Sequence, residues 1–341
     1  MERIRVLLLF GGESAEHDVS IASARNVFAA LDDQKYQVIV SYIDREGKWW
    51  LTESVTSLSI ENSPMLMPLL GASAVVTSTG ERLPVDVIVP ILHGPNGEDG
   101  SVQGLAQLLH VPIVGPGITG SAVCMDKDVF KRLMRQAGLP VVDYQLYRRG
   151  QSLPSFNDLK AALGHPLFVK PANMGSSVGI SKATTEDDLR HAIETALKYD
   201  DKVVIERAVS GRELECAVLG NESPQASVVG EIRPDGDFYS YDAKYDEDST
   251  SETIIPADLS TDIAKRIRDL AVQAYQVAEC RGLARVDFFL DEHNRVFINE
   301  INTLPGFTDI SMYAKLWAHD DINYSNLLDK LIGLALETKR S

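Results

Sequence analysis

The sequence predicts an α/β protein, with an open parallel α/β unit first and a mixed α+β region in the C-terminal half. Over about the first ninety residues, short apolar runs alternate with helical patterns, which is typical of a parallel sheet covered by helices. Further along, one strand leads into a glycine-rich loop, and two later strands are separated by a short polar turn. The 341 residues exceed what one hydrophobic core usually serves, so two or three packed units are expected.

The first unit begins with a strand–helix–strand pattern. Strands are expected at Val6–Phe10, Gln37–Ile43 and Asp86–Leu92, which are short apolar runs. Apolar residues between the first two strands recur at helical spacing, so one face of that helix is expected to pack on the sheet. These residues are Val19, Ala22, Val27, Ala30 and Leu31.

Two features mark the transition to the next unit. Residues 54–80 mix Ser, Thr, Pro and Gly without a strong period, and we interpret them as a surface insertion. After Gly115 a helix is expected at about 126–137, because Gly138 and Pro140 follow it as helix-ending signals.

The remaining elements follow from the same signals. Strands are expected at Leu167–Lys170 and Val203–Glu206, and Thr185 with Asp188 predicts a capped helix between them. A long helix is expected at about 259–280, followed by a hairpin. The chain closes with a helix whose apolar positions are Leu327, Leu328, Leu331 and Leu334.

Composition excludes several classes of protein. A formal charge of −16 without clustered Lys and Arg disfavours nucleic-acid binding. The apolar run at Val6–Phe10 is too short for a signal peptide, and no run approaches the roughly 18–20 apolar residues of a membrane span. Cys124, Cys216 and Cys280 are scattered, which indicates neither a disulfide framework nor a zinc site. We expect a cytoplasmic protein with no nucleic-acid or membrane partner.

The predicted hairpin carries the strongest chemical signal. Alternation along a strand puts Arg285 and Asp287 on one face, and Glu300 and Asn302 likewise share a face. If His293-Asn294 forms a tight turn with Asn294 at positive φ, Asp287 lies opposite Glu300 and Arg285 opposite Asn302. Oxygen ligands of this kind suit Mg²⁺, and facing carboxylates require a positive charge between them. The alternative is a solvated hairpin face with ordinary charges.

The loop Val169–Gly179 is the second signal. Its small residues let backbone N–H groups approach phosphate oxygens, and Lys170 at the end of the strand adds positive charge. It is not a Walker A loop, because the lysine precedes the glycines. Taken alone, the loop is equally well explained as a mobile Gly/Ser turn.

Other glycine patterns are weaker. Gly115–Gly120 satisfies GxGxxG, but it does not follow the first strand and Pro116 lacks an N–H, which argues against a dinucleotide site. Gly11-Gly12 follows the first strand without the third glycine of that fingerprint, and can present a helix N-terminus to an anion or carboxylate.

Charged and imidazole side chains follow the first and third strands, where open α/β sheets bind ligands. They are Glu16, His17, His93, Glu98 and Asp99. Glu16 is equally well explained as a charge favoured at a helix start. His93 is equally well explained as a turn residue bonded to backbone.

Four motifs in order along nearly the whole chain resemble the D-alanine–D-alanine ligases of the ATP-grasp superfamily. They are Phe10–His17 (FGGESAEH), His93–Gly100 (HGPNGEDG), Lys170–Gly179 (KPANMGSSVG) and Asn299–Gly306 (NEINTLPG). The departures we see are the 54–80 insertion, present in only some members, and Asn294 at a turn position often held by Gly.

The resemblance implies three domains. They are an N-terminal α/β substrate domain at 1–115, a central ATP-grasp subdomain at 116–210, and a C-terminal ATP-grasp subdomain at 211–341 with a lid loop at about 239–255. ATP is expected between the last two. Two Mg²⁺ (or Mn²⁺) ions are expected on Asp287, Glu300 and Asn302, with Glu300 bridging them.

The resemblance also implies roles for individual residues. For ATP, Lys127 and Lys170 are expected to contact the phosphates. Glu206, Arg207 and Val209 are expected to line the adenine pocket, and Glu213 to hold the ribose hydroxyls. Toward the first D-alanine, the expected residues are Glu16, Ser176 and Tyr245, with His93 in the substrate site. Toward the oxyanion and the second D-alanine, they are Arg285, the Gly306 N–H, Lys244 and Ser311.

The expected activity is therefore ATP-dependent joining of two D-alanine molecules for peptidoglycan precursor synthesis, by a protein whose family fits a homodimer. The nearest alternative is a related ligase making D-alanyl-D-lactate or D-alanyl-D-serine. An alternative of another class is a regulatory nucleotide-binding module without the chemistry, and the presence of Arg285, Asp287, Glu300 and Asn302 argues against it.

Overall fold

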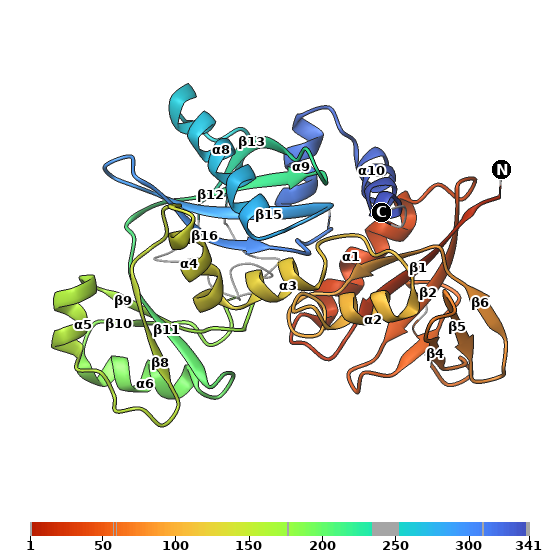
Figure 1. Cartoon of the computed structure of the whole chain (residues 1–341), viewed down its shortest axis with the longest axis horizontal. Coiled ribbons are helices and arrows are strands. Elements are labelled where there is room, and N and C mark those ends of the chain that lie inside the picture. The colour runs from red at the N-terminus through yellow and green to blue at the C-terminus, as the bar shows by residue number, and fades with distance from the viewer. Residues whose placement is uncertain are drawn as a thin grey trace.

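A computed structural model describes residues 2–56, 58, 60–175, 177–233, 252–308 and 310–338. Its described strands form four sheets. Figure 1 shows an N-terminal unit in red and orange, a middle segment in yellow and green, and a C-terminal segment in cyan and blue. In the part of the chain described, no helix is long and apolar enough to cross a membrane.

The N-terminal unit contains the predicted parallel sheet. Its strand order is β3-β2-β1-β7, with β1 parallel to β2 and β7. The elements are β1 (Ile4–Gly11), α1 (His17–Ala30), β2 (Tyr36–Ile43), β3 (Trp49–Leu51), β7 (Val87–Ile91) and α2 (Ser101–Leu109). Val6, Leu8 and Phe10 of β1 pack in one core while Leu7 and Leu9 pack in another, so both faces of the sheet are covered.

Helix α1 is found where the apolar spacing predicts it, but the predicted face is partly wrong. Two serines, Ser20 and Ser23, are fully buried, whereas Val19 and Ala22 are only half-buried. Ser20 Oγ accepts a hydrogen bond from the Gly11 N–H at 2.7 Å and donates to the Ile91 carbonyl. The buried Ser20 hydroxyl thus finds its hydrogen-bond partners at the ends of β1 and β7. The spacing of apolar residues in the sequence does not reveal that a serine is buried here.

Residues 54–80 are more than a surface insertion, so that interpretation needs correction. They contribute to a three-stranded antiparallel sheet, β4 (Leu66–Leu69), β5 (Ala74–Thr77) and β6 (Arg82–Pro84). Leu66 and Val75 are buried in the core that also holds Leu7 and Leu9 of β1. The strands are only three or four residues long and are separated by turns rich in Gly, Ser and Thr, so no clear period is visible in the sequence.

The middle segment carries a four-stranded sheet in the order β10-β9-β11-β8, in which neighbouring strands are antiparallel. Its elements are α3 (Ile118–Met125), α4 (Lys127–Gln136), β8 (Tyr144–Arg148), α5 (Phe156–Leu163), β9 (Leu167–Pro171), β10 (Ser181–Ala183), α6 (Glu186–Ala196) and β11 (Lys202–Arg207). The predicted cap is confirmed: Thr185 and Asp188 form a reciprocal capping box at the start of α6.

The C-terminal segment carries a five-stranded sheet in the order β14-β13-β12-β15-β16. Its elements are β12 (Gly211–Leu219), β13 (Gln225–Arg233), β14 (Glu252–Ile254), α8 (Thr261–Val277), β15 (Leu283–Asp291), β16 (Val296–Asn302) and α9 (Met312–His319). Alternate residues of β12 face two cores, Cys216 packing with α8 and Ala217 with α9. Strand β14 occupies part of the expected lid, whose residues 239–251 lie outside the described chain.

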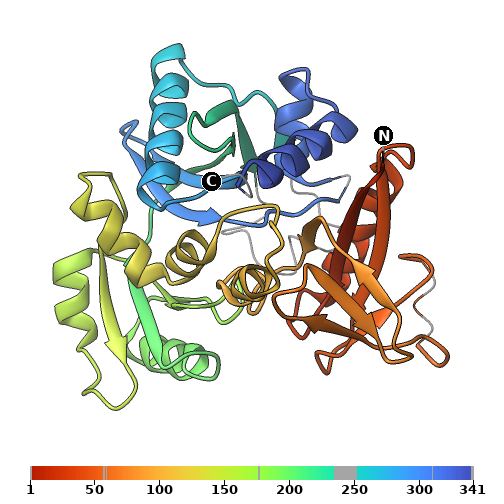
Figure 2. The same cartoon turned by 45° about the vertical axis from the view of Figure 1, so that its right-hand side comes forward.

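The last helix, α10 (Tyr324–Glu337), packs against the N-terminal unit, beside α1 and β7 (Figures 1 and 2). Leu327, Leu328 and Leu331 are buried in the same core as Val6 and Val89. Asp329 on this helix accepts hydrogen bonds from Lys35 Nζ at 2.6 Å and from the Tyr36 hydroxyl at 2.7 Å. The two ends of the chain therefore share one hydrophobic core.

The three cysteines are buried and free, so none of them forms a disulfide in the structure. Cys124 Sγ and Cys280 Sγ lie 3.7 Å apart within one core.

Candidate active site

Glu16 lies in the turn before α1, at the carboxyl end of β1, and is almost fully buried. Two glycines leave room for its carboxylate. A Cβ atom added to Gly94 would lie 3.1 Å from Glu16 Oε2, and one added to Gly175 would lie 3.3 Å from it. Because Gly94 follows β7 and Gly175 belongs to the glycine-rich loop, Glu16 lies where the N-terminal unit and the middle segment meet. Ser176, Lys244 and Tyr245 lie outside the described residues.

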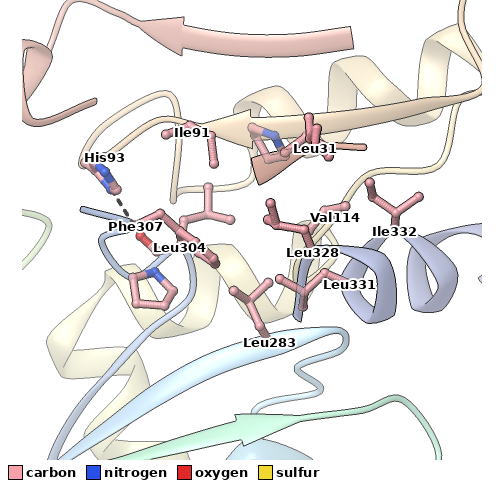
Figure 3. A pocket seen from close by; sticks show the side chains of 13 residues that line it. Leu31, Ile91, His93, Val114, Leu283, Leu304, Phe307, Leu328, Leu331 and Ile332 are labelled. Atoms are coloured by element: carbon pink, nitrogen blue, oxygen red, sulfur yellow. Dashed lines mark hydrogen bonds between the residues drawn. The ribbon is translucent and has the colours of Figure 1, made fainter. Parts of the chain in front are cut away.

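His93 is buried directly after β7 and bridges distant parts of the chain. Its Nδ1 lies 3.1 Å from the Leu304 carbonyl oxygen, as Figure 3 shows, and its Nε2 lies 3.5 Å from Ser23 Oγ. Burial lowers the pKa of His93 despite the nearby Glu16 carboxylate, which favours a neutral ring. The apolar cavity drawn in Figure 3 has a volume of only about 10 Å³, so His93 borders packed side chains on that side.

The predicted pairing of the hairpin is confirmed. Asp287 lies opposite Glu300 and Arg285 opposite Asn302. Asn294 has the predicted positive φ, at 58°.

The predicted two-residue turn of this hairpin is wrong. Leu290 pairs with Val296, and the Asp291 N–H bonds to the Arg295 carbonyl at 3.0 Å, which leaves a three-residue loop. The register shifts by one residue between Asp287 and Phe288, and this irregularity restores the Asp287–Glu300 pairing.

Carboxylates form a row across three neighbouring strands. Asp287 on β15 pairs with Glu215 on β12 and with Glu300 on β16. The positive charge that such a row requires is present in Arg285. Its guanidinium bonds to both Asp287 oxygens at 2.7 Å, and its Nε lies 3.0 Å from Glu215 Oε2. Burial alone would lower the pKa of Arg285, but Asp287 and Glu215 hold it well above its usual value.

The residues expected to bind metal lie together on the hairpin. Asn302 Nδ2 donates to Asp287 Oδ2 at 2.9 Å, and Glu300 Oε2 lies 3.6 Å from Lys127 Nζ. Among the described residues, no group of three or more His, Cys, Asp and Glu side chains is arranged to hold a metal. The available donors are carboxylate and amide oxygens, which fit Mg²⁺ if phosphate and water complete its shell.

The lysines expected at the phosphates converge from α4 and β9. Lys127, the first residue of α4, donates to the Met174 carbonyl at 2.6 Å, which places it beside the glycine-rich loop. Lys170 donates to Glu206 Oε2 at 2.8 Å, across the β9–β11 pairing. Glu206 Oε1 lies 3.0 Å from Lys131 Nζ, so two lysines share one buried carboxylate.

The residues expected near adenine and ribose lie on β11, the link after it and β12. The Arg207 guanidinium lies 5.3 Å from the centre of the Phe297 ring, a cation–π arrangement that fixes its direction. Val209 is half-buried in the link, and Glu213 is half-buried on β12. The structure thus places these residues along one path from the middle segment to the C-terminal sheet.

Gly306 and Ser311 are packed against each other after β16. A Cβ atom on Gly306 would lie 2.8 Å from Ser311 Oγ, so any larger residue would displace that hydroxyl. Ser311 precedes α9, and its Oγ accepts from the Thr308 N–H at 3.0 Å.

Three site residues were not singled out for these positions by the sequence: Glu98, Lys131 and Glu215. Glu98 was noted only as a charge after a strand, and its partner Leu304 lies far along the chain. Lys131 falls on α4 four residues after Lys127, so helical spacing places both on one face. Glu215 lies two residues after Glu213 on β12, and period-two alternation puts both on one face of that strand.

Comparisons of the sequence with known proteins match D-alanine–D-alanine ligases along nearly the whole chain. The family model described as "D-ala D-ala ligase N-terminus" matches residues 5–116, and "D-ala D-ala ligase C-terminus" matches residues 133–333. D-alanine–D-alanine ligase A of Escherichia coli (strain K12) is 47% identical, covering 99% of this chain and 97% of the relative.

Solved structures of such ligases are also similar to this chain over nearly its whole length. The D-alanine–D-alanine ligase of Coxiella burnetii has a TM-score of 0.90 at 37% identity, covering 100% of this chain and 96% of that one. The VanG D-Ala:D-Ser ligase of Enterococcus faecalis has a TM-score of 0.89 at 33% identity, covering 98% and 100%. The chain belongs to the D-alanine–D-alanine ligase family.

Proposed function

We propose that this protein joins two D-alanine molecules into D-alanyl-D-alanine at the expense of ATP, for peptidoglycan precursor synthesis. The observation that carries the proposal is the arrangement on β15 and β16. Asp287, Glu300 and Asn302 supply oxygen donors there, and the Arg285 guanidinium lies beside them. A carboxylate has no leaving group, and this set of residues suits a phosphoryl transfer that provides one.

ATP is proposed to lie between the middle and C-terminal segments. Lys127 and Lys170 would contact its phosphates, since Lys127 bonds to the Met174 carbonyl of the glycine-rich loop and Lys170 lies on β9, the strand that leads into this loop. Glu206, Arg207 and Val209 would line the adenine pocket, and Glu213 would hold the ribose hydroxyls.

Two Mg²⁺ (or Mn²⁺) ions are proposed on Asp287, Glu300 and Asn302, with Glu300 shared between them. When bound, such ions neutralise charge on the transferring phosphoryl group and align it. The oxygen donors of Asp287, Glu300 and Asn302, which lie together on the hairpin, support this assignment.

In the first step, a carboxylate oxygen of the first D-alanine attacks the γ-phosphorus of ATP. The bond between that phosphorus and the bridging oxygen breaks, which gives D-alanyl phosphate and ADP. Glu16 would hold the ammonium group of this D-alanine, with Ser176 and Tyr245 in the same hydrogen-bonded set. His93 would border this substrate as a neutral ring, as its burial favours.

In the second step, the neutral amine of the second D-alanine attacks the acyl carbon. The carbon–oxygen bond to phosphate breaks, inorganic phosphate leaves, and the nitrogen loses a proton. Arg285 and the Gly306 N–H would stabilise the oxyanion, as fixed donors in a dry site do. Lys244 and Ser311 would hold the carboxylate of the second D-alanine.

The roles of the three domains, the lid, the compartment and the oligomeric state are part of the same proposal. Residues 1–115, 116–210 and 211–341 would act as substrate domain, central subdomain and C-terminal subdomain, with a lid at about 239–255 that keeps water from the acyl phosphate. The family resemblance supports a cytoplasmic homodimer.

A second candidate function has one specific observation in its favour. A D-Ala:D-Ser ligase is among the similar solved structures, so D-serine is a plausible second substrate on structural grounds. The D-lactate alternative would share every ATP and metal residue and differ in the lid.

The test is mass spectrometry of products formed from ATP, Mg²⁺ and a panel of D-amino and D-hydroxy acids. D-Alanyl-D-alanine as the main product, with phosphate release that requires D-alanine, supports the proposal. Phosphate release that is independent of any D-amino acid would instead favour a nucleotide-binding module without ligase chemistry.

A further inference from the structure

Glu98 joins two loops from opposite ends of the chain. Its Oε2 accepts a hydrogen bond from the Gly94 N–H at 2.8 Å, within its own loop after β7. Its Oε1 accepts from the Leu304 N–H at 3.2 Å, in the segment after β16. One side chain therefore connects the N-terminal unit with the loop that leads to Gly306.

Leu304 is held at both of its backbone polar groups. Its N–H bonds to Glu98, and its carbonyl oxygen lies 3.1 Å from His93 Nδ1 (Figure 3). A third bond follows two residues beyond Pro305, where the Phe307 N–H donates to Ser23 Oγ of α1 at 3.3 Å. Gly306 lies between these anchors, which hold the backbone on both sides of it.

We propose that Glu98 is a positioning residue of the ligation step, which fixes the Leu304–Gly306 segment so that the Gly306 N–H points at the oxyanion. This inference rests on the proposed function, because it assigns that N–H to the second step. Glu98 itself would touch neither substrate nor ATP.

The surroundings of Glu98 support a dedicated role. None of the ion pairs formed by described residues includes Glu98, and its charged neighbours Glu16 and Glu300 are also acids. Burial and Glu16 raise the pKa of Glu98 to about 8. A carboxyl group is costly in such a place, and its two backbone hydrogen bonds offset the cost.

The neighbouring residue provides a matched control. Asp99 also accepts two backbone hydrogen bonds, from the Asn96 N–H and the Ser101 N–H, each at 2.9 Å. Both donors belong to the same loop or its helix start, so Asp99 shapes the loop without reaching Leu304. Glu98→Gln and Asp99→Asn each replace a carboxyl group by an amide at adjacent residues, but they differ in this one connection.

The experiment measures dipeptide and phosphate together for the full chain. In Glu98→Gln, the side-chain NH₂ faces one of the two N–H donors, so one anchor is lost. We expect kcat for dipeptide formation to fall by at least about tenfold while KM for ATP stays within about twofold. The ratio of phosphate to dipeptide should be higher than in the wild type, because slower attack by the amine lengthens the lifetime of the acyl phosphate and more of it is hydrolysed.

The outcomes separate this inference from the proposed function. If the wild type makes no dipeptide, the proposed function fails before any variant is compared. If it does, and Glu98→Gln keeps the wild-type rate and phosphate-to-dipeptide ratio, the inference is wrong. Equal uncoupling in Asp99→Asn also overturns it, because loop folding would then suffice.

A second variant covers the case in which Glu98→Gln does not fold. Ser23→Ala removes the acceptor of the Phe307 N–H from the other side of Gly306. The same direction of uncoupling, with a smaller loss of kcat, is expected. An unchanged phosphate-to-dipeptide ratio in Ser23→Ala would show that these anchors do not direct the Gly306 N–H.

Discussion

Lys131 Nζ lies 3.0 Å from Glu206 Oε1, and the side chains of both residues are almost inaccessible to solvent, at 1% and 2% exposure. Lys170 bonds to the other carboxylate oxygen at 2.8 Å. Burial alone would raise the pKa of Glu206, but the two lysines lower it to about 2. The middle segment therefore contains a buried carboxylate that depends on two cations.

Lys131→Met should destabilise the protein by about 3–5 kcal/mol near neutral pH, because it leaves a buried carboxylate short of one partner. The folded pKa of Glu206 lies below its ordinary value of 4.5, so its ion pairs stabilise the protein fully above that pH. Their contribution is lost as pH falls from there toward 2.

Urea unfolding at several pH values measures this effect. The difference between wild type and Lys131→Met should shrink as pH is lowered from neutral toward about 4, since Glu206 takes up a proton earlier in the variant. Lys265→Met is the control, because Lys265 and its partner Asp269 are both exposed and their ion pair should contribute at most about 1 kcal/mol. A difference that does not vary with pH would contradict the ionic explanation.

Glu300→Gln should abolish turnover with only a modest change in stability. The substitution removes the proposed shared metal ligand, while relief of repulsion from the facing Asp287 carboxylate offsets the lost ion pair with Lys127 in the protein without metal. Turnover at saturating Mg²⁺ and thermal unfolding without metal give the two readouts. Glu292→Gln, in the turn of the same hairpin, should leave turnover unchanged, and wild-type-like turnover in Glu300→Gln would exclude the bridging role.

D-Alanine should outcompete D-lactate as second substrate from about pH 6 to 9, and the preference should widen as pH rises. The attacking amine must be neutral, and a cation such as Lys244 lowers the pKa of a neighbouring ammonium group. Product partitioning with both acceptors present checks this expectation. Mainly depsipeptide near neutral pH would refute the D-alanyl-D-alanine assignment and leave the family membership intact.

Tyr245→Phe should lower kcat more than it weakens ATP binding. The hydroxyl is proposed to bond with Ser176 and Glu16 over the reactants, away from the adenine pocket. Kinetics at varied ATP separate the two effects. An equal loss in kcat and in ATP affinity would place Tyr245 in the nucleotide site instead.

Asp329→Asn should lower the free energy of unfolding by about 1–2 kcal/mol, because the hydroxyl of the buried Tyr36 loses a charged acceptor. Denaturant unfolding measures the change. Asp269→Asn is the control, since its exposed pair with Lys265 lies within α8 alone. Equal losses in both variants would show that charge removal, and not the contact between α10 and β2, is responsible.

The hairpin shows how much of the site could be predicted. Strand alternation together with an assumed tight turn placed Asp287 opposite Glu300, and the tolerance of Asn for positive φ was enough to predict the backbone of Asn294. The length of the turn could not be predicted from this pairing. A two-residue turn with regular strands and a three-residue loop with a one-residue register shift both place Asp287 opposite Glu300.

Other features depend on contacts between distant segments. Ser20 and Ser23 are buried because the strand ends and Phe307 use their hydroxyls, and an apolar period cannot show this. Glu98 meets Leu304 only after two units have packed together. The 54–80 segment contributes Leu66 and Val75 to a core whose other residues are remote in sequence.

The position of α10 has a consequence for folding while the chain is being synthesised. Val89 and Ile91 of β7 line the apolar region that Leu328, Leu331 and Ile332 of α10 close. Helix α1 covers part of this face of the first sheet, but the part that α10 closes stays uncovered until residues 324–337 have left the ribosome. The N-terminal unit therefore passes through a stage with exposed apolar surface, during which aggregation competes with folding.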